Sequence, residues 1–377
     1  MNIQIDGTDM LNRGAELMLI AVLEQIEKRR PSATVYYNTQ RPLRPYIQEQ
    51  SGLDLRQRPA LKYSRYPIGI LKRLNLSFTQ FTEMHPAQNI DLILDASGFQ
   101  FSDQWNYSKE RLDKLVNYYR TLKKNGTKII MLPQALGPFE TPAGKRAVDI
   151  IENYVDIIVA REEVSRKYLV DAGASSDKVW QCTDFTLLVK GTFPEKFSSV
   201  KDKFCIIPNK KMVTHTEADS GKYWAFLENL IVEIEKAGRD IFLLNHEGPG
   251  DLEMCQAINK RFENRFEVVS GLNAKDTKGI IGASYAAISS RFHGVASALN
   301  QGIPCLATSW NHKYEMLFKD FHLEDKILYL DAEKGVNEQK VANLLEQRQE
   351  LHRQISERKT VLVKEVENMW NKVWDLV

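Results

Sequence analysis

The sequence lacks any long uninterrupted apolar run. No window approaches the roughly 18 apolar residues that a membrane-spanning helix needs. The first residues, MNIQIDGTDM, contain no basic stretch followed by an apolar one, so no secretory signal peptide is expected. The sequence also lacks an excess of charge of either sign, because 51 Lys and Arg are balanced by 49 Asp and Glu in 377 residues. Such a balance gives no overall field to attract nucleic acid. We therefore expect a cytoplasmic protein without a nucleic-acid partner.

Cysteine is scarce, and histidine shows no metal-binding spacing. The cysteines lie far apart with no C-x-x-C pair, which favours reduced side chains that fill apolar space. They are Cys182, Cys205, Cys255 and Cys305. No H-x-x-x-H or similar pair occurs among the seven histidines, so we expect no metal site.

The sequence does contain a regular alternation of short apolar runs and amphipathic helical stretches, which predicts βαβ units and parallel sheets. Residues 190–203 are polar, contain proline and lack periodicity, and we interpret them as a linker. The predicted fold is therefore α/β, with two Rossmann-like, doubly wound parallel-sheet domains facing a cleft, over residues 1–190 and 204–337. Residues 338–377 are highly charged with helical spacing, which predicts a helical segment that packs outside or crosses back to the first domain.

Open parallel sheets bind ligands beyond the carboxyl ends of their strands, so the polar residues that follow predicted strands are the candidates for a site. Asn12 and Gly14 open the first predicted helix. A glycine there would let the backbone approach a ligand, and the free N–H groups favour an anion or a hydroxyl. The alternative is a helix cap with a tight turn.

Arg161 ends the apolar run VDIIVA. An arginine that leaves a buried strand needs a partner, because burying an unpaired charge is costly. A phosphate or carboxylate ligand would suit its guanidinium. The alternative partners are the nearby acids Glu162, Glu163 and Asp184.

The stretch SSRFHGVASALNQGIP carries the clearest pair of candidates. Arg291 and His293 follow an apolar run and precede a predicted helix, whose N-terminus favours an anion. Small residues such as Gly294 would let that helix lie close to the sheet. Arginine, imidazole and helix dipole would then converge, which is typical of an anion site with a proton donor. The alternative is a histidine that fastens a loop to the sheet.

Two further features have a less specific interpretation. His246 and Glu247 follow another predicted strand, and the sequence EGPGD, residues 247–251, is predicted to be a loop. A lone His-Glu is not a metal motif. Residues 55–82 contain six Arg or Lys and no acid, with aromatic and aliphatic residues between them. This composition suits a segment that rests on an anionic membrane surface or meets an anionic substrate. The alternative is a solvated connection over the first sheet.

Taken in order, the motifs NRGAE, LPQALGPF, AREEVS and SRFHG resemble those of the polysaccharide pyruvyl transferases, over residues 1–325. The resemblance implies a GT-B-like pair of domains. It implies transfer of a pyruvyl group from phosphoenolpyruvate to two hydroxyls of one sugar, in a glycan or a lipid-linked glycan precursor. The products would be a cyclic ketal and phosphate, and neither metal nor bound cofactor is needed. Residues 1–190 would form the acceptor side and residues 204–337 the donor side.

The resemblance also gives the candidate residues their roles. Those expected to bind the donor are Arg161, Arg291, His293 and Gly294. His293 is expected either to donate the proton or to hold the phosphate. The candidates for the catalytic base are Glu16, Asp95 and Glu247. The candidates for acceptor binding are Asn12, Gln134, Asn245 and His246. Residues 55–82 would bring the protein to the inner face of the membrane.

Two alternative functions remain open. A GT-B glycosyltransferase would place the diphosphate of a nucleotide sugar at the same helix N-terminus. Residues 294–302, however, contain no acid that could hold the ribose hydroxyls. A non-catalytic carbohydrate-binding member is the other alternative. Ala15 and Ser97 stand where many members of the family have Asp and Gly.

Overall fold

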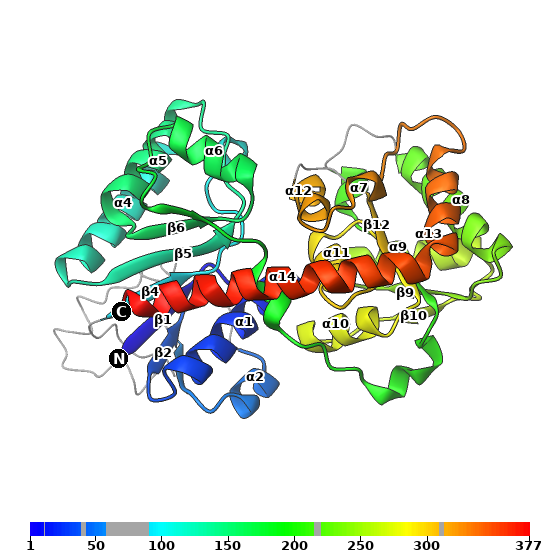
Figure 1. Cartoon of the computed structure of the whole chain (residues 1–377), viewed down its shortest axis with the longest axis horizontal. Coiled ribbons are helices and arrows are strands. Elements are labelled where there is room, and N and C mark those ends of the chain that lie inside the picture. Colours follow the sequence, from blue (N-terminus) through cyan, green and yellow to red (C-terminus); the bar gives the residue numbers. More distant parts are fainter. Residues whose placement is uncertain (11, 39–42, 58–89, 215–219, 309–312) are drawn as a thin grey trace, which may run out of the picture. The chain divides into compact units, whose positions relative to one another are not determined.

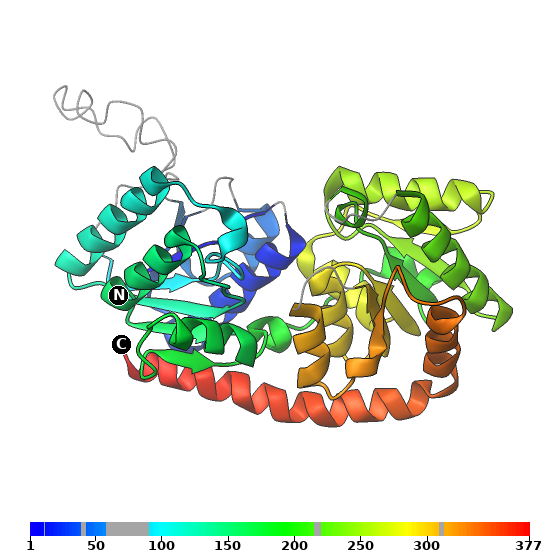
Figure 2. The same ribbon diagram turned by 90° about the horizontal axis from the view of Figure 1, so that it is seen from above.

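The computed structural model describes residues 1–10, 12–38, 43–57, 90–214, 220–308 and 313–377. The chain divides into two compact units. The first comprises Met1–Met10, Ala15–Thr186 and Glu365–Val377, and the second comprises Leu11–Gly14 and Leu187–Lys364. Each unit is a parallel sheet with helices on both of its faces (Figures 1 and 2). The predicted α/β fold class is thereby confirmed.

The first unit contains a seven-stranded sheet in the order β3-β2-β1-β4-β5-β6-β7, with every neighbouring pair parallel. The order reverses between β1 and β4, which is the switch point where such sheets bind ligands. The register pairs Asp6 with Asp95 at this point. The strands are β1 Asn2–Asp6, β2 Thr34–Tyr37, β3 Asp54–Gln57, β4 Leu92–Asp95, β5 Lys128–Gln134, β6 Ile157–Ala160 and β7 Val179–Gln181.

The helices of the first unit follow from their apolar spacing and their caps. In α1, Leu19, Val22 and Ile26 are fully buried and share one face of the helix. Ser108 and Thr141 cap α4 and α5 by accepting hydrogen bonds from backbone N–H groups of the first turn. The helices are α1 Arg13–Arg29, α2 Pro45–Gln50, α4 Lys109–Lys124, α5 Pro142–Tyr154 and α6 Glu163–Asp171.

The second unit contains a six-stranded parallel sheet in the order β10-β9-β8-β11-β12-β13, which reverses between β8 and β11. Four of its strands are fully buried and consist almost entirely of apolar residues, as expected when helices cover both faces of the sheet. The strands are β8 Phe204–Ile207, β9 Ile241–Leu244, β10 Glu267–Val269, β11 Ala286–Ser289, β12 Cys305–Thr308 and β13 Ile327–Leu328.

Helix α11 lies very close to this sheet because Gly294 has no side chain. A Cβ at Gly294 would lie 2.4 Å from Ser289 Oγ and 3.1 Å from Ile207 Cδ1. The helices of the second unit are α7 Lys211–Thr214, α8 Ser220–Lys236, α9 Gly248–Arg261, α10 Ala274–Gly282, α11 Phe292–Leu299, α12 Lys313–Asp320 and α13 Val336–Glu346.

The chain ends in one long helix, α14 (Arg348–Asp375), whose last part belongs to the first unit. There Trp370 is fully buried and packs edge-on against Phe185, with 6.1 Å between ring centroids. Arg29 Nη2 donates to Asn371 Oδ1 at 2.6 Å. Both interactions attach the C-terminal turns to the core of the first unit.

Several local predictions need correction. The sequence EGPGD was predicted to be a loop, but α9 already begins at Gly248. Pro249 lies in the first turn, where its missing N–H group breaks no helical hydrogen bond. The elements α2, α7, α10, β3 and β10 were not predicted at all. Within the predicted linker, residues 190–203, Glu195–Val200 form a 3₁₀ helix.

The basic segment, residues 55–82, lies outside the described residues from residue 58 onward, and residues 55–57 are part of β3. No helix in the described ranges is long and apolar enough to cross a membrane.

Candidate functional site

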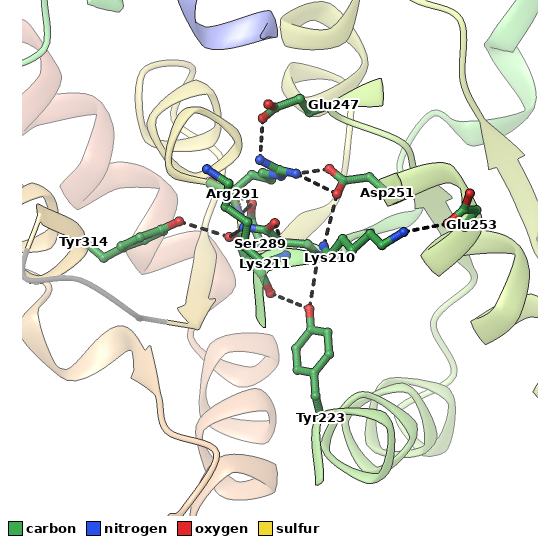
Figure 3. A network of polar contacts seen from close by, with 11 residues as sticks. Lys210, Lys211, Tyr223, Glu247, Asp251, Glu253, Ser289, Arg291 and Tyr314 are labelled. Carbon is green, nitrogen blue, oxygen red and sulfur yellow. Dashed lines mark hydrogen bonds and ion pairs between the residues drawn. The ribbon is translucent and has the colours of Figure 1, made fainter. Parts of the chain in front are cut away.

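Arg291 lies at the carboxyl edge of the second sheet, immediately before α11, and is held by two carboxylates (Figure 3). Its Nε donates to Asp251 Oδ2 at 2.8 Å, and its Nη2 donates to Asp251 Oδ1 at 2.7 Å. Its Nη1 donates to Glu247 Oε2. Burial opposes the charged form of Arg291, but the hydrogen bonds and charge of Asp251 outweigh it and raise the pKa. The arginine therefore remains a cation.

Asp251 was not among the predicted site residues. It lies in the first turn of α9, its side chain is fully buried, and it also accepts a hydrogen bond from the backbone N–H of Lys210 at 3.2 Å. It thus joins the loops that follow β8, β9 and β11. Asp251 lies in a stretch that was predicted to be a loop, so helical periodicity could not indicate that its side chain points toward Arg291.

The backbone that carries Arg291 is held by a buried polar network. Ser290 Oγ contacts the hydroxyls of Tyr223 at 2.8 Å and Thr308 at 2.5 Å. Its carbonyl oxygen accepts from Asn209 Nδ2 at 2.8 Å and from the Tyr314 hydroxyl at 3.0 Å. Fully satisfied buried networks of this kind make their surroundings rigid. The strand ends therefore present Arg291 from a fixed scaffold.

His246 follows β9 and is 4% exposed. Its Nδ1 has no hydrogen-bond partner within the described part of the chain. Burial, followed by the charges of Arg291, His293 and Arg13, lowers the pKa of His246 well below its usual value. The residue is therefore a neutral imidazole in cationic surroundings.

Residues 12–14 belong to the second unit, and the backbone of Gly14 lies against His293. A Cβ at Gly14 would lie 2.0 Å from His293 Nδ1, so only glycine allows this approach of backbone to imidazole. The backbone N–H of Gly14 donates to Asn12 Oδ1 at 2.8 Å, which is the helix-cap alternative for Asn12. His293 lies in the first turn of α11, next to the Phe292 ring.

In the first unit, Asp95 lies at the switch point of the sheet and is 4% exposed. Its Oδ1 accepts from the backbone N–H of Ser97 at 2.9 Å and from the Ser97 hydroxyl at 2.5 Å. Burial, together with the nearby charge of Asp6, raises the pKa of Asp95 to about 6, although the Ser97 bonds oppose this. Asp95 can therefore change its protonation state near neutral pH.

Asp6, the strand neighbour of Asp95, is held in a small network of its own. Its Oδ1 accepts from Gln4 Nε2 at 2.6 Å, and its Oδ2 accepts from the Tyr118 hydroxyl at 2.6 Å. The charge of Asp6 disfavours a second charge on Asp95. Asp6 was not a predicted site residue, because register between strands is not visible in a single sequence.

The other predicted residues of the first unit have structural contacts. Glu16 is fully buried, accepts from the Tyr46 hydroxyl, and lies 3.2 Å from Arg44 Nε. Gln134 is also fully buried, and its Oε1 accepts from the backbone N–H of Gln100 at 3.2 Å. The Nε2 of Gln134 has no hydrogen-bond partner in the described ranges.

Arg161 forms an ion pair with Glu162, one of its predicted alternative partners, with Nε 3.8 Å from Glu162 Oε2. Both side chains are buried. Ser165 contacts the other oxygen of Glu162 and accepts a hydrogen bond from the backbone N–H of Leu136 at 2.7 Å. The motif AREEVS therefore ties the start of α6 to the LPQALGPF loop.

The structure thus brings four of the predicted residues together at the carboxyl edge of the second unit's sheet, where Asp251 joins them: His246, Glu247, Arg291 and His293. Asp95 lies at the switch point of the first unit's sheet. The side chain of Asn245 follows β9 beside His246, and its Oδ1 has no hydrogen-bond partner in the described chain. No group of three His, Cys, Asp or Glu that could hold a metal occurs among the described residues.

Comparison with solved structures identifies relatives of this fold. HepE of Anabaena in complex with UDP-glucose has 14% sequence identity and a TM-score of 0.59, with 100% of each chain covered. MnaA of S. aureus with UDP has 14% identity and a TM-score of 0.55, covering 98% of this chain and 96% of that one. A UDP-GlcNAc 2-epimerase of Methanocaldococcus jannaschii has 10% identity and a TM-score of 0.59, covering 92% of each. At such identities, the likeness shows a GT-B-like fold alone.

Comparison of sequences identifies the family. No curated protein matches the sequence significantly. The sequence does match the family described as "Polysaccharide pyruvyl transferase" over residues 12–312, which spans both units and every candidate described above. The chain therefore belongs to the polysaccharide pyruvyl transferase family.

Proposed function

We propose that this protein transfers a pyruvyl group from phosphoenolpyruvate to two hydroxyls of one sugar, forming a cyclic ketal and releasing phosphate. The acceptor sugar would belong to a glycan or a lipid-linked glycan precursor. Family membership supports a transferase acting on polysaccharide. The single observation that carries the donor assignment is the convergence of the Arg291 cation with the imidazoles of His246 and His293 at the N-terminus of α11.

The chemistry of the donor suits this cluster. Phosphoenolpyruvate carries a phosphate and a carboxylate, and both are groups that a guanidinium binds through paired hydrogen bonds. The N–H groups at the start of α11 add donors and a favourable dipole. His246, held neutral by its surroundings, can donate or accept one hydrogen bond without adding charge.

The reaction needs one acid and one base. A proton added to the methylene carbon of the donor creates an oxocarbenium-like centre, which one sugar hydroxyl attacks as it loses its proton. A second hydroxyl then displaces phosphate and closes the ketal ring, and its proton leaves with the phosphate. His293 is our candidate for the proton donor or the phosphate contact. Asp95 is our candidate for the base, since a pKa of about 6 leaves it largely ionised at neutral pH.

The alternative donor is a nucleotide sugar. The relatives HepE and MnaA were solved with UDP or UDP-glucose, but their identity to this chain is too low to transfer a ligand. Helix α11, with the sequence FHGVASAL, contains no acid that could bind ribose hydroxyls. This composition favours phosphoenolpyruvate over a nucleotide.

The test is to incubate the full chain with phosphoenolpyruvate and a panel of glycans, and to measure released phosphate together with ketal formation by mass spectrometry. We expect both products in equal amounts, and their loss in His293→Ala. His322→Asn is the matched control, because His322 is exposed and has a φ of 59°, which asparagine tolerates. Turnover that requires a nucleotide sugar and ignores phosphoenolpyruvate would contradict the proposal.

Contact of residues 55–82 with the inner face of the membrane, and a cytoplasmic location, stay predictions. Anionic liposomes would test the first of these by co-sedimentation of the whole chain. We expect binding that is lost when the six basic residues are replaced by glutamine. Equal sedimentation of both proteins would argue against a membrane role for the segment.

A further inference from the structure

The two carboxylates that hold Arg291 differ in geometry (Figure 3) and in burial. Asp251 takes the side edge of the guanidinium through two hydrogen bonds, to Nε and to Nη2. Glu247 takes a single position, on Nη1. The Asp251 side chain is 0% exposed, whereas that of Glu247 is 23% exposed.

Asp251 cannot leave Arg291 at low cost. Its side chain is fully buried, accepts two hydrogen bonds from Arg291, and also accepts one from the backbone N–H of Lys210. Separating this pair would leave a buried charge without compensation, which is strongly unfavourable. The Asp251 contact is therefore a permanent part of the fold.

Glu247 is in the opposite situation. It precedes α9 as the N-cap residue, and its side chain makes no cap hydrogen bond there. Solvent already reaches the side chain, so a carboxylate that swings away from Arg291 can regain its hydration. Glu247 occupies Nη1, which lies on the end of the guanidinium that Asp251 leaves open.

An arginine has five N–H donors, and Asp251 uses one on Nε and one on Nη2. The remaining donors lie on Nη1 and Nη2, and they form the end-on edge that suits a second carboxylate or a phosphate. In this structure Glu247 partly fills that edge. An anionic ligand that binds there end-on must displace it.

We propose that Asp251 is a positioning residue that fixes the orientation of Arg291, and that Glu247 is an internal competitor, displaced when the donor's carboxylate or phosphate binds Arg291. The inference rests on the proposed function, because it takes phosphoenolpyruvate as the donor. It reassigns Glu247, which the family resemblance suggested as a candidate base, to the control of donor affinity.

The two roles have opposite consequences. Replacing Glu247 by glutamine keeps its size but removes the charge that competes with the donor, so donor binding becomes stronger. Replacing Asp251 by asparagine removes the anion that orients Arg291, so donor binding becomes weaker. A purely structural role for both residues would weaken binding in both variants.

The experiment is calorimetric titration of phosphoenolpyruvate into the full chain and three variants. We expect Glu247→Gln to lower the Kd by about three- to tenfold, and Asp251→Asn to raise it by about tenfold or more. Glu253→Gln is the control, because Glu253 lies on the same helix, is 65% exposed and pairs with Lys210. Its Kd should equal that of the wild type.

Each outcome decides one question. A Kd for Glu247→Gln equal to or higher than that of the wild type overturns the displacement, even if Asp251→Asn does not fold. If Asp251→Asn does not fold, Asp251→Glu is used in its place. It keeps the negative charge but has a longer side chain, and it should also raise the Kd. If the wild-type chain binds phosphoenolpyruvate but the two variants do not shift the Kd in opposite directions, the inference is overturned and the proposed function is not. A wild-type chain that does not bind phosphoenolpyruvate overturns the proposed function and the inference with it.

Discussion

The guanidinium of Arg291 and the carboxylate of Asp251 lie side-on to each other, with Nε–Oδ2 and Nη2–Oδ1 distances of 2.8 and 2.7 Å. The pair joins the start of α9 to the start of α11, so the helix ends that border the candidate donor site are fixed by one buried ion pair. Stability and donor binding are therefore coupled at this position.

The stability consequence of this pair can be measured directly. Asp251→Asn should lower the free energy of unfolding by about 3–5 kcal/mol, because it removes the fully buried carboxylate that binds Arg291 through two hydrogen bonds. Glu247→Gln should cost at most about 1 kcal/mol, because its side chain is partly solvated. Urea unfolding of both variants checks this. Equal losses of stability would contradict the distinction between the two carboxylates.

Asp95 should make the first unit less stable at neutral and alkaline pH. Its pKa is raised from 3.8 in the unfolded chain to about 6 in the folded protein, so its ionisation opposes folding above pH 6. Asp95→Asn should therefore stabilise the protein by about 2–3 kcal/mol at pH 8. The gain should shrink as the pH falls through 6 and disappear near pH 4. Denaturant unfolding across this range checks it, and a gain that does not depend on pH would contradict it.

His246 should contribute a pH dependence of the opposite sign. Its pKa is lowered in the folded protein, so below about pH 6.5 the unfolded chain binds a proton that the folded chain does not. Stability should then fall as the pH is lowered from 6.5, and His246→Asn should flatten this part of the profile. Nitrogen NMR shifts of the imidazole give a second readout. A histidine that becomes charged between pH 6 and 7 would be inconsistent with this account.

Ser165 should contribute to stability through the LPQALGPF loop rather than through the reaction. Ser165→Ala leaves the buried backbone N–H of Leu136 without its acceptor, which should cost about 1–3 kcal/mol. Ser176→Ala, at an exposed position in the same unit, is the control and should cost little. Thermal unfolding compares the two, and a similar small effect for both would rule out the predicted role of the motif.

The fold was largely predictable from the sequence, because buried parallel strands are short apolar runs and the intervening helices have apolar faces. The runs IIVA and AAIS lie fully buried in β6 and β11. Strand β3, with the sequence DLRQ, was missed because this edge strand is only partly buried and lacks that pattern. The start of α9 was missed because a Gly-Pro-Gly sequence usually signals a turn.

The site was predictable only in part. Strand-end position drew attention to Arg291 and Asp95, and the structure places both at the carboxyl edge of a parallel sheet, as the alternation of strands and helices predicts. Asp251, the partner of Arg291, was missed because an ion pair between α9 and the start of α11 depends on tertiary packing. Asp6, the strand neighbour of Asp95, was missed because the register between β1 and β4 also depends on tertiary packing. Arg161 shows the same limit, since the sequence offered several acids and the fold selects Glu162.

The most direct test of the central claim is a comparison of donors on the intact protein. Phosphoenolpyruvate and UDP-glucose are each titrated calorimetrically into the wild-type chain and into His293→Ala. We expect phosphoenolpyruvate to bind the wild type, its affinity to fall in His293→Ala, and UDP-glucose not to compete. Binding of UDP-glucose in the absence of any phosphoenolpyruvate binding would contradict the account.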